Sequence, residues 1–438
     1  MGVHGLWEAV KPAATGQSIE DFFVREGFEQ RKGERVYRLG IDASIWLYQV
    51  QNTFAVGHAQ SGENPELRTL FFRLARLLRL LVHATFVFDG QDRPPKKRGK
   101  KVIKTSHWMV AAMKQFIDAF GYDWWMAPGE AEAELALMNS FGIFDGVLTD
   151  DSDTLLFGAQ VVIRNYSAKD QMLTVVSADS IFKHQALRLT RPGMILFALL
   201  TGGDYETGLQ GFGPRVACGL ARYGFGERLC EAVRKLHGDA LSQFLSSWRD
   251  DLRVTLRTDN LKLLGRRYQS LSDRIPDTFP NLAVVDLYRN PVTSPLEDFE
   301  KTPAQPPDVA SLGVLCERYF SWGTPSGIIE RFGNCLLPGV VLRSLIKCAI
   351  NRDMAEAAKE PLVNQLEGLV HVNPDKSPRR SNNARFVTAI DTGFAALAVS
   401  GLVGLRPDDG TVVVHAGALS RRFSMHETLV QHLNEESY

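Results

Sequence analysis

The chain has 438 residues, of which 45% are hydrophobic and 23% charged, as in ordinary globular proteins. Its 50 Lys and Arg balance 50 Asp and Glu, so no overall basic field points to nucleic acid. The five cysteines form no CxxC pair, which argues against a zinc site or a disulfide framework. Because the chain shows no signal-peptide pattern and no apolar run of about 18 residues, we expect an intracellular protein with no membrane partner.

Strand and helix patterns alternate over the first two hundred residues. Five short apolar runs predict strands, at 36–41, 84–88, 147–149, 161–164 and 173–176. Three segments with apolar residues three and four positions apart predict helices, at 66–83, 105–120 and 128–139. This alternation is typical of an α/β fold with a mostly parallel sheet and flanking helices. From residue 194 to about 349 the pattern is helical.

Seven acidic residues stand where such strands end, or at the helix starts and turns beside them: Asp42, Asp89, Glu130, Glu132, Asp151, Asp153 and Asp204. Sites in parallel sheets lie beyond the carboxyl ends of the strands. Mg²⁺ takes oxygen ligands, and two such ions about 4 Å apart stabilise both oxygens of a phosphodiester cleavage. Carboxylates that converge without cations would repel one another. The acids are therefore candidates for a two-metal site.

The spacing alone leaves a plainer interpretation open. An Asp after a strand is commonly a turn residue or a helix cap, and a Glu at a helix start complements the helix dipole. Helical periodicity also pairs Glu130 with Glu134, because positions two apart do not share a face. Only a first-turn position would let Glu130 and Glu132 reach the same site.

Six short motifs occur in order: MGVHGLW at 1–7, GIDAS at 40–44, VFDG at 87–90, GEAEAE at 129–134, TDDSD at 149–153 and GDY at 203–205. This series resembles the flap endonuclease/XPG superfamily of structure-specific 5′ nucleases, over about residues 1–350. The resemblance implies a PIN-like nuclease core and two Mg²⁺ ions, with Mn²⁺ as a substitute. It also implies that all seven acids serve the metals, with Glu132, Asp151 and Asp153 as direct ligands and the other four acting directly or through water. The implied reaction is in-line attack by metal-activated water, which leaves a 5′-phosphate.

Within the superfamily, the chain most resembles the GEN/Yen class of Holliday-junction resolvases. The opening motif, the interval of only 41 positions from Asp89 to Glu130, and a β-rich C-terminal segment favour that class. The class implies a nuclear enzyme that binds branched DNA as a homodimer, resolves four-way junctions by paired symmetric cuts and also cuts 5′ flaps. Two alternatives remain: a flap or excision-repair nuclease that makes single cuts, and a catalytically silent protein that binds DNA structures. The complete acid set argues against the second.

A strongly basic segment, QDRPPKKRGKK at 91–101, follows Asp89, and five of its residues are candidate DNA contacts: Lys96, Lys97, Arg98, Lys100 and Lys101. A charge run is usually a solvated face or a localisation signal. The resemblance instead gives Arg98 or Lys97 the role of holding the scissile phosphate as charge develops on it. The short interval suggests an arch too small to form a closed tunnel, which would admit a junction that has no free end.

Glycines mark two further candidate DNA contacts. In Gly211-Phe212-Gly213-Pro214-Arg215, the glycines allow backbone N–H groups at a helix start to approach a phosphate, although an ordinary helix turn has the same pattern. Its place after Asp204 resembles the hairpin of a helix-two-turn-helix, where Gly211, Gly213 and Arg215 would contact duplex and K⁺ would bind. In the family the N-terminus lies beside the metals, which makes Gly2 a candidate as well.

These patterns predict five regions: nuclease regions at 1–105 and 106–200, a helix-two-turn-helix and helical DNA-binding region at 201–350, a linker at 351–383 that is most polar from 371, and a chromodomain-like segment at 384–438. In the last region we expect strands at 386–390, 394–400 and 411–414 and a helix at 424–433. Because it contains no Trp for an aromatic cage, we expect DNA contact or a structural role in place of methyl-lysine binding.

Overall fold

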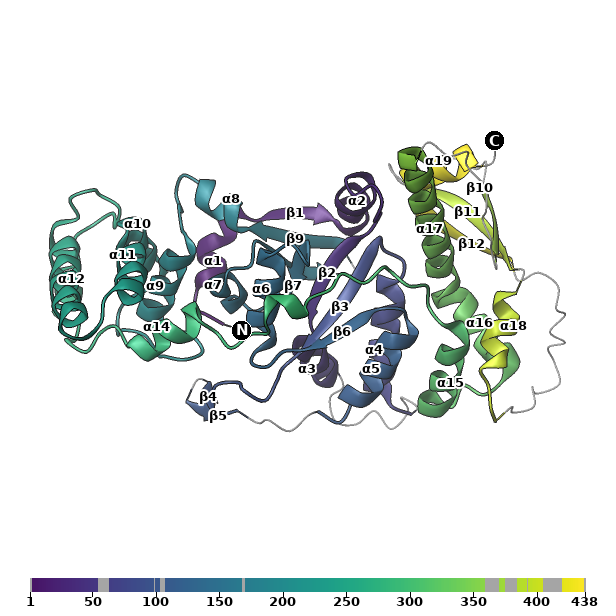
Figure 1. The fold of residues 1–438 in the computed structure, drawn as a ribbon, viewed down its shortest axis with the longest axis horizontal. Coiled ribbons are helices and arrows are strands. Elements are labelled where there is room, and N and C mark those ends of the chain that lie inside the picture. Colours follow the sequence, from purple (N-terminus) through teal and green to yellow (C-terminus); the bar gives the residue numbers. More distant parts are fainter. Residues whose placement is uncertain are drawn as a thin grey trace.

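The structure is a computed structural model that describes residues 2–53, 63–97, 99–102, 107–167, 170–358, 370–374, 384–391, 393–404 and 420–436. The molecule is elongated, with a central sheet between a helical region at one end and a second helical region that carries a small sheet at the other (Figure 1). The N-terminus lies at the centre, beside the large sheet, and the C-terminus lies at the far end.

The central sheet has seven strands in the order β1-β9-β8-β7-β2-β3-β6. Their bounds are β1 Thr15–Ser18, β2 Tyr37–Asp42, β3 Val82–Phe88, β6 Asp123–Met126, β7 Gly146–Leu148, β8 Val161–Ser167 and β9 Met172–Ser177. Neighbouring strands from β8 to β6 run parallel, and β9 pairs antiparallel with both β8 and β1. The predicted α/β class with a mostly parallel sheet is confirmed, and the five expected strands are present. β1 and β6 were not predicted.

Alternate residues of the central strands face two separate cores. Ile41, Phe86 and Leu148 belong to one apolar cluster, and their neighbours Val87 and Val147 belong to another. Period-two alternation of this kind is what a sheet covered on both faces requires.

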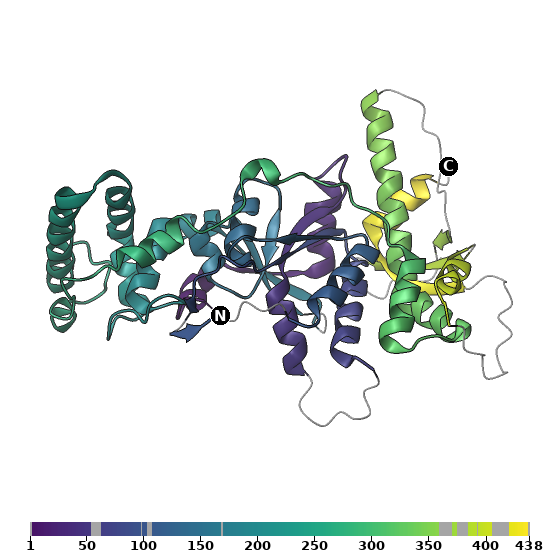
Figure 2. The same ribbon diagram turned by 60° about the horizontal axis from the view of Figure 1, so that its bottom comes forward.

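Helices cover both faces of the sheet. α3 Ala43–Thr53, α4 Pro65–Leu77 and α5 Val110–Ala119 pack into the first core, and Figure 2 shows α3 and α4 lying side by side. α6 Ala131–Ser140 packs on the other face, close to Gly40 of β2, where a Cβ would lie 2.6 Å from side-chain atoms of Leu135 and Phe144.

The helix expected at 66–83 ends earlier than its apolar spacing predicts. α4 ends at Leu77, and β3 begins at Val82. The apolar residues after Leu77 continue the helical spacing, but Val82 pairs with Tyr37 of β2. Strand pairing therefore ends the helix where the local pattern does not.

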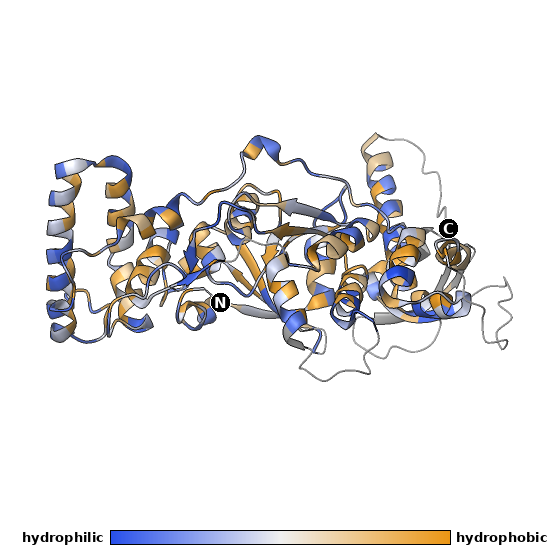
Figure 3. Cartoon of the chain, turned by 90° about the horizontal axis from the view of Figure 1, so that it is seen from below, coloured by the Kyte–Doolittle hydropathy of each residue, from blue (hydrophilic) through white to orange (hydrophobic). Residues whose placement is uncertain are grey.

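Helices dominate from residue 178 to 289: α8 Ala178–Lys183, α9 Arg191–Thr201, α10 Pro214–Arg222, α11 Phe225–Lys235, α12 Gly238–Thr258, α13 Gln269–Ser272 and α14 Leu282–Arg289. They share an apolar core with α1 Leu6–Val10 and α7 Asp153–Phe157. Figure 3 shows hydrophobic residues on the facing sides of α11 and α12 and hydrophilic residues on their outer sides. The predicted helical character of this region is confirmed.

From α14 the chain returns across the sheet as an extended strap, residues 290–308, to a second helical group (Figure 1). This group consists of α15 Val309–Phe320, α16 Pro325–Cys335 and α17 Leu337–Ala358. Among the described residues no single helix has the length and apolar composition of a membrane span, and only α16 and α17 taken together, across a bend of 53°, reach them.

A small three-stranded sheet, β10 Val370–Pro374, β11 Ala384–Asp391 and β12 Ser420–His426, forms the C-terminal module with α18 Phe394–Ser400 and α19 Glu427–Glu436. It contacts the rest of the chain: His426 Nε2 lies 3.1 Å from Asp21, and Glu317 of α15 accepts hydrogen bonds from the amides of Val403 and Gly404.

Three expectations for this module were wrong in detail. Residues 394–400 form a helix and not a strand, because Phe394 and Ala398, four positions apart, are both buried against the body. The predicted linker contains strand β10, and the last helix begins at Glu427, three residues later than expected. The expected strand at 411–414 lies outside the described residues, and the region boundaries themselves remain predictions.

Candidate metal centre

The central strands bring six of the seven acids to one edge of the sheet. Asp42 is the last residue of β2, Asp89 follows β3, and Asp151 and Asp153 follow β7, which is the neighbour of β2. Glu130 stands immediately before α6, and Glu132 lies in its first turn. Asp204 comes from the turn after α9. All except Asp89 are buried polar residues, with at most 9% of their surface exposed.

Lys97 lies among three of these acids. Its ammonium group contacts Glu130 and lies 3.5 Å from Glu132 Oε1 and 3.4 Å from Asp204 Oδ2. Burial disfavours the charge on Lys97, but Glu132 and Glu130 outweigh that effect and hold its pKa above the usual value. The structure therefore brings Glu130, Glu132 and Asp204 to one point, with a cation between them.

Asp42 and Asp89 each also cap a helix. Asp42 Oδ1 accepts hydrogen bonds from the amides of Ser44 (2.9 Å) and Ile45 (3.2 Å), and Asp89 Oδ1 accepts one from the amide of Ala131 (3.0 Å). Asp42 otherwise has acidic surroundings: burial, Asp89 and Asp151 raise its pKa to about 8. The second oxygen of Asp89 accepts a hydrogen bond of 2.8 Å from the Ser44 hydroxyl. Capping and ion binding are thus compatible at Asp42, because only one of its two oxygens accepts the capping hydrogen bonds.

Asp151 and Asp153 form the part of the cluster that most favours a bound cation. The carboxylate of Asp151 accepts the Asp153 amide at 3.0 Å. Asp153 is 1% exposed, and neither of its side-chain oxygens has a hydrogen-bond partner within the described part of the chain. Burial, Asp151 and Asp204 raise its pKa well above the usual value. Two buried oxygens with no donor are costly, and a divalent cation would satisfy both.

The donor set fits a hard divalent cation, since every candidate ligand is a carboxylate. As the side chains stand, no three His, Cys, Asp or Glu residues among those described are arranged to hold a metal ion. The ammonium group of Lys97 holds Glu130, Glu132 and Asp204 instead. A divalent ion that bound there would have to displace it.

Glu134 is turned away from this centre. Its Oε1 accepts a hydrogen bond of 2.7 Å from the indole of Trp125, and its Oε2 accepts one of 3.0 Å from the amide of Ser294 in the strap. Glu134 therefore fixes the strap to the back of α6. The pair suggested by helical periodicity is not the pair that meets Lys97.

Gly2 lies directly against the acids. Its φ is +85°, and a Cβ at this position would lie 2.3 Å from Asp151 Oδ1 and 2.6 Å from Asp153 Oδ1. The next residues hold this arrangement, because the Val3 amide donates to Ser152 Oγ at 2.8 Å and the Trp7 indole donates to the Asp150 carbonyl at 2.9 Å. The chain start thus forms one wall of the centre.

Three residues near the acids were not among the predicted site residues. The Tyr205 hydroxyl donates to Glu130, and its ring lies 4.9 Å from that of Tyr288, whose buried hydroxyl has no hydrogen-bond partner in the described structure. Arg93 Nη1 lies 3.2 Å from Asp89 Oδ2. Tyr205 follows Asp204 in the GDY motif and Arg93 lies in the basic segment, so both carried a signal. Tyr288 comes from α14 and carried none.

The basic segment forms a hairpin of β4 Lys96–Lys97 and β5 Lys100–Lys101. Only Lys97 of these four turns towards the acids, and the other three side chains are exposed. Arg98, the other candidate for the scissile phosphate, lies outside the described residues. The hairpin therefore places one cation at the centre and an exposed basic surface beside it.

The glycine turn after Asp204 also has the expected local form. Gly213 precedes α10 as its N-cap and has open space around it, Gly211 has a φ of +89°, and Arg215 is exposed. The turn is held next to the chain start, since a Cβ on Gly5 would lie 2.5 Å from Pro214 Cγ. A helix N-terminus thus faces solvent on the same side of the molecule as α1.

Comparison with known proteins places these features in a family. Residues 1–107 match the XPG N-terminal domain, and residues 121–204 match the XPG I-region. The human flap endonuclease GEN homolog 1 is 28% identical over 273 residues, which cover 57% of this chain and 27% of that protein. The Holliday junction resolvase YEN1 of Saccharomyces cerevisiae is 22% identical over 397 residues, which cover 68% of this chain and 52% of that one. The chain therefore spans only a quarter to a half of the length of these relatives.

Solved structures are similar to the same group of proteins. The crystal structure of the Holliday junction-resolving enzyme GEN1 with product DNA and Mg²⁺ matches with a TM-score of 0.73 and 28% identity, covering 98% of this chain and 96% of that one. The same enzyme has been solved with Mg²⁺ and Mn²⁺ and with potassium. The order of the sequence motifs and the fold therefore indicate the same family of proteins.

Proposed function

Because this chain belongs to the XPG/flap endonuclease superfamily, we propose that it is a structure-specific DNA endonuclease that resolves four-way junctions. The observation that carries the proposal is the buried acid cluster, in which Asp153 has two oxygens without donors next to Asp151 and Asp204. The similarity to GEN1 along 98% of the chain supports the choice of junctions. Paired symmetric cuts need two active sites, so the active form on a junction is a homodimer.

The seven acids would hold two Mg²⁺ ions, or Mn²⁺ in their place. The ions would supply positive charge to the attacking and leaving oxygens of the scissile phosphate. Glu132, Asp151 and Asp153 are the proposed direct ligands, and the caps made by Asp42 and Asp89 hold those two carboxylates in place. Lys97, released from the acids when ions bind, would then reach the phosphate from the hairpin, with Arg98 as the other candidate.

DNA outside the centre would be held through its backbone. Exposed Lys96, Lys100 and Lys101 offer charge, while Gly211, Gly213 and Arg215 offer amides and a guanidinium at the start of α10. A K⁺ ion at this turn would complete a phosphate contact, and GEN1 has been solved with potassium bound. The C-terminal module would add DNA contacts or support the body, and action on junctions implies a nuclear protein.

The metal assignment is tested by removing single acids of the cluster and comparing them with an acid outside it. Asp42→Ala and Glu132→Ala should abolish Mg²⁺-dependent cutting of a labelled junction while leaving its affinity, measured in Ca²⁺, within a few-fold of wild type. Glu134→Gln is the control, because that side chain binds Trp125 and the strap in place of the centre. Retained Mg²⁺-dependent cutting in both Ala variants would refute the assignment.

A cruciform in a supercoiled plasmid separates resolution from single cutting. Two cuts across the junction within one binding event give linear plasmid, whereas one cut gives a relaxed circle. Resolution predicts that linear product appears without accumulation of the circle, and that this requires two copies of the chain per junction. Efficient cutting of 5′ flaps with no product from the cruciform would instead favour the flap or excision-repair nuclease.

A further inference from the structure

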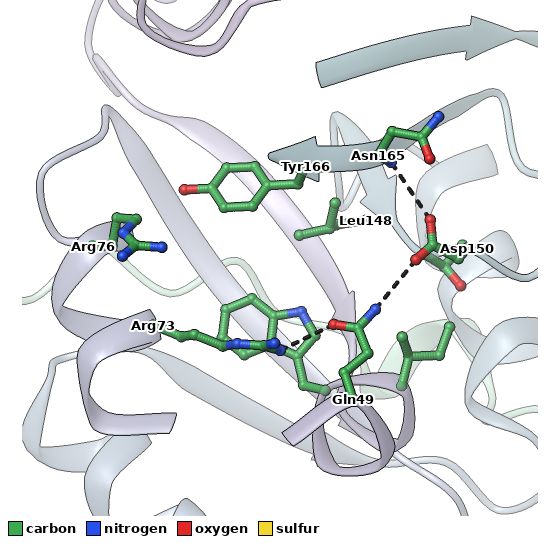
Figure 4. A pocket seen from close by; sticks show the side chains of 10 residues that line it. Gln49, Arg73, Arg76, Leu148, Asp150, Asn165 and Tyr166 are labelled. Carbon is green, nitrogen blue, oxygen red and sulfur yellow. Dashed lines mark hydrogen bonds between the residues drawn. The ribbon is translucent and has the colours of Figure 1, made fainter. Parts of the chain in front are cut away.

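A pocket of about 320 Å³ lies beside the metal centre, between α3, α4 and the ends of β7 and β8. Its floor is apolar, formed by Ile45, Trp46 and Leu148. Polar side chains stand around the rim, and Figure 4 shows two arginines on one side and an acid with two amides on the other. The pocket is therefore divided into a cationic end, an apolar floor and a hydrogen-bonding end.

The cationic end consists of Arg73 and Arg76, one turn apart on α4. Neither guanidinium takes part in a salt bridge with a described residue, whereas Arg31, Arg35, Arg38 and Arg93 do. Arg73 lies 5.7 Å from the centre of the Trp46 ring and donates to Gln49 Oε1 at 3.0 Å. Burial and the neighbouring Arg76 lower its pKa. Two adjacent guanidiniums that form no ion pair with a described carboxylate leave positive charge that an anion would neutralise.

The hydrogen-bonding end consists of Asp150, Gln49 and Asn165. Gln49 Nε2 donates to Asp150 Oδ2 at 3.2 Å, and the Asn165 amide donates to Asp150 Oδ1 at 3.5 Å. Asn165 has a φ of +51°, a backbone form that Asn tolerates and that breaks the pairing of β8 at this point. The two side-chain amides and the carboxylate provide donors and acceptors together, as the edge of a base requires.

The same chain segments contribute residues to the pocket and to the metal centre. Asp150 directly precedes Asp151, and the amide of Ile45, on the pocket floor, donates to Asp42 at 3.2 Å. A ligand in the pocket would therefore lie next to the strand that is cut. One whole nucleotide matches the division of the pocket: a phosphate for the arginines, a flat apolar face for the floor, and a polar base edge for the amides.

We propose that this pocket holds one unpaired nucleotide of a DNA strand at the branch, with its phosphate between Arg73 and Arg76 and its base edge at Gln49 and Asp150. The proposal rests on the proposed function, because it takes the strand from branched DNA. The chemistry recognised is that of a deoxynucleoside phosphate, which a free mononucleotide shares. An unpaired nucleotide arises at a branch because stacking is interrupted there, so occupancy would select branched over continuous duplex.

Binding is tested without cleavage, with the full chain in EDTA and dCMP, deoxycytidine and inorganic phosphate as probes in calorimetric titrations. We expect dCMP to bind at least tenfold more tightly than deoxycytidine. The double variant Arg73→Gln/Arg76→Gln should lose that difference, and the control Arg79→Gln, which lies just after the end of α4 and outside the pocket, should keep it. Gln49→Met should weaken dCMP binding but not phosphate binding. Equal binding of dCMP to wild type and to the double variant would overturn the proposal, and so would equal binding of dCMP and deoxycytidine.

The source of the nucleotide is decided by competition. If the pocket takes a strand of the branch, dCMP should raise the KM for junction cutting in wild type and leave it unchanged in the double variant. Binding of dCMP without any effect on KM would overturn the assignment to the branch. Failure of the proposed function is distinguishable. A chain that binds dCMP through Arg73 and Arg76 but cuts no branched DNA would support the nucleotide pocket and refute the proposed endonuclease activity.

Discussion

The close approach of Gly2 to the metal ligands allows a sharp test of how the chain start supports cutting. We consider Gly2→Ala, which adds a single methyl group. The new Cβ would lie 2.3 Å from Asp151 Oδ1, 2.4 Å from Ser152 Oγ and 2.6 Å from Asp153 Oδ1, so at least one of these atoms must move. The residue would also have to adopt a φ of +85° with a side chain.

The two costs can be separated. A side chain in the left-handed region costs about 1–2 kcal/mol, and forcing a methyl group into a filled site costs about 1–3 kcal/mol. Gly33 has the same φ of +85° but no atom within 4 Å of its Cβ position, so Gly33→Ala incurs only the first cost. The difference in effect between the two variants therefore measures the steric clash of the new methyl group with Asp151 and Asp153. A displacement of about 1 Å at reacting groups lowers the rate by roughly 100-fold.

The assay compares single-turnover cutting rates on a four-way junction in saturating Mg²⁺, with affinity for the junction measured in Ca²⁺. We expect Gly2→Ala to cut about 100-fold more slowly with nearly unchanged affinity, whereas Gly33→Ala should cut at the wild-type rate and show only a small loss of thermal stability. Equal rates for the two alanine variants would refute the view that the chain start positions the acids.

Three further predictions concern stability. Lys97→Met should destabilise the metal-free protein by about 3 kcal/mol, because it leaves buried acids without their cation, and Mg²⁺ should restore most of the loss in thermal unfolding; a loss that is identical with and without Mg²⁺ would contradict this contact. The pKa of Asp42 is raised in the folded state to about 8, so the folded carboxyl binds its proton more tightly than the unfolded one. Stability in EDTA should therefore fall as pH rises from about 4 to 8, and Mg²⁺ should reduce the slope; a melting temperature that rises over this range would argue against it. Trp125→Phe removes one donor to buried Glu134 and should cost about 1–3 kcal/mol in urea unfolding with no loss of cutting; reduced cutting by a fully folded variant would show that Glu134 acts at the centre.

The sequence by itself determined the type of sheet and the order of the acids along it. Short apolar runs at β2, β3 and β7 each end at an Asp, and residues that follow parallel strands must lie at one edge. The cations close behind Asp89 were equally readable, since charge density needs no knowledge of the fold. These features are local, and each can be stated from a few neighbouring residues.

Tertiary structure decided which residues actually meet. Helical periodicity pairs Glu130 with Glu134, but the hydrogen bonds of Glu134 to Trp125 and to Ser294, 160 residues away, turn it to the back of α6. Tyr288 reaches the acids from α14, the Gly2 backbone presses on Asp151, and the pocket of Arg73 and Asp150 joins α4 to the end of β7. Such contacts depend on strand order and helix packing, which arise from pairings between distant segments that no local pattern contains.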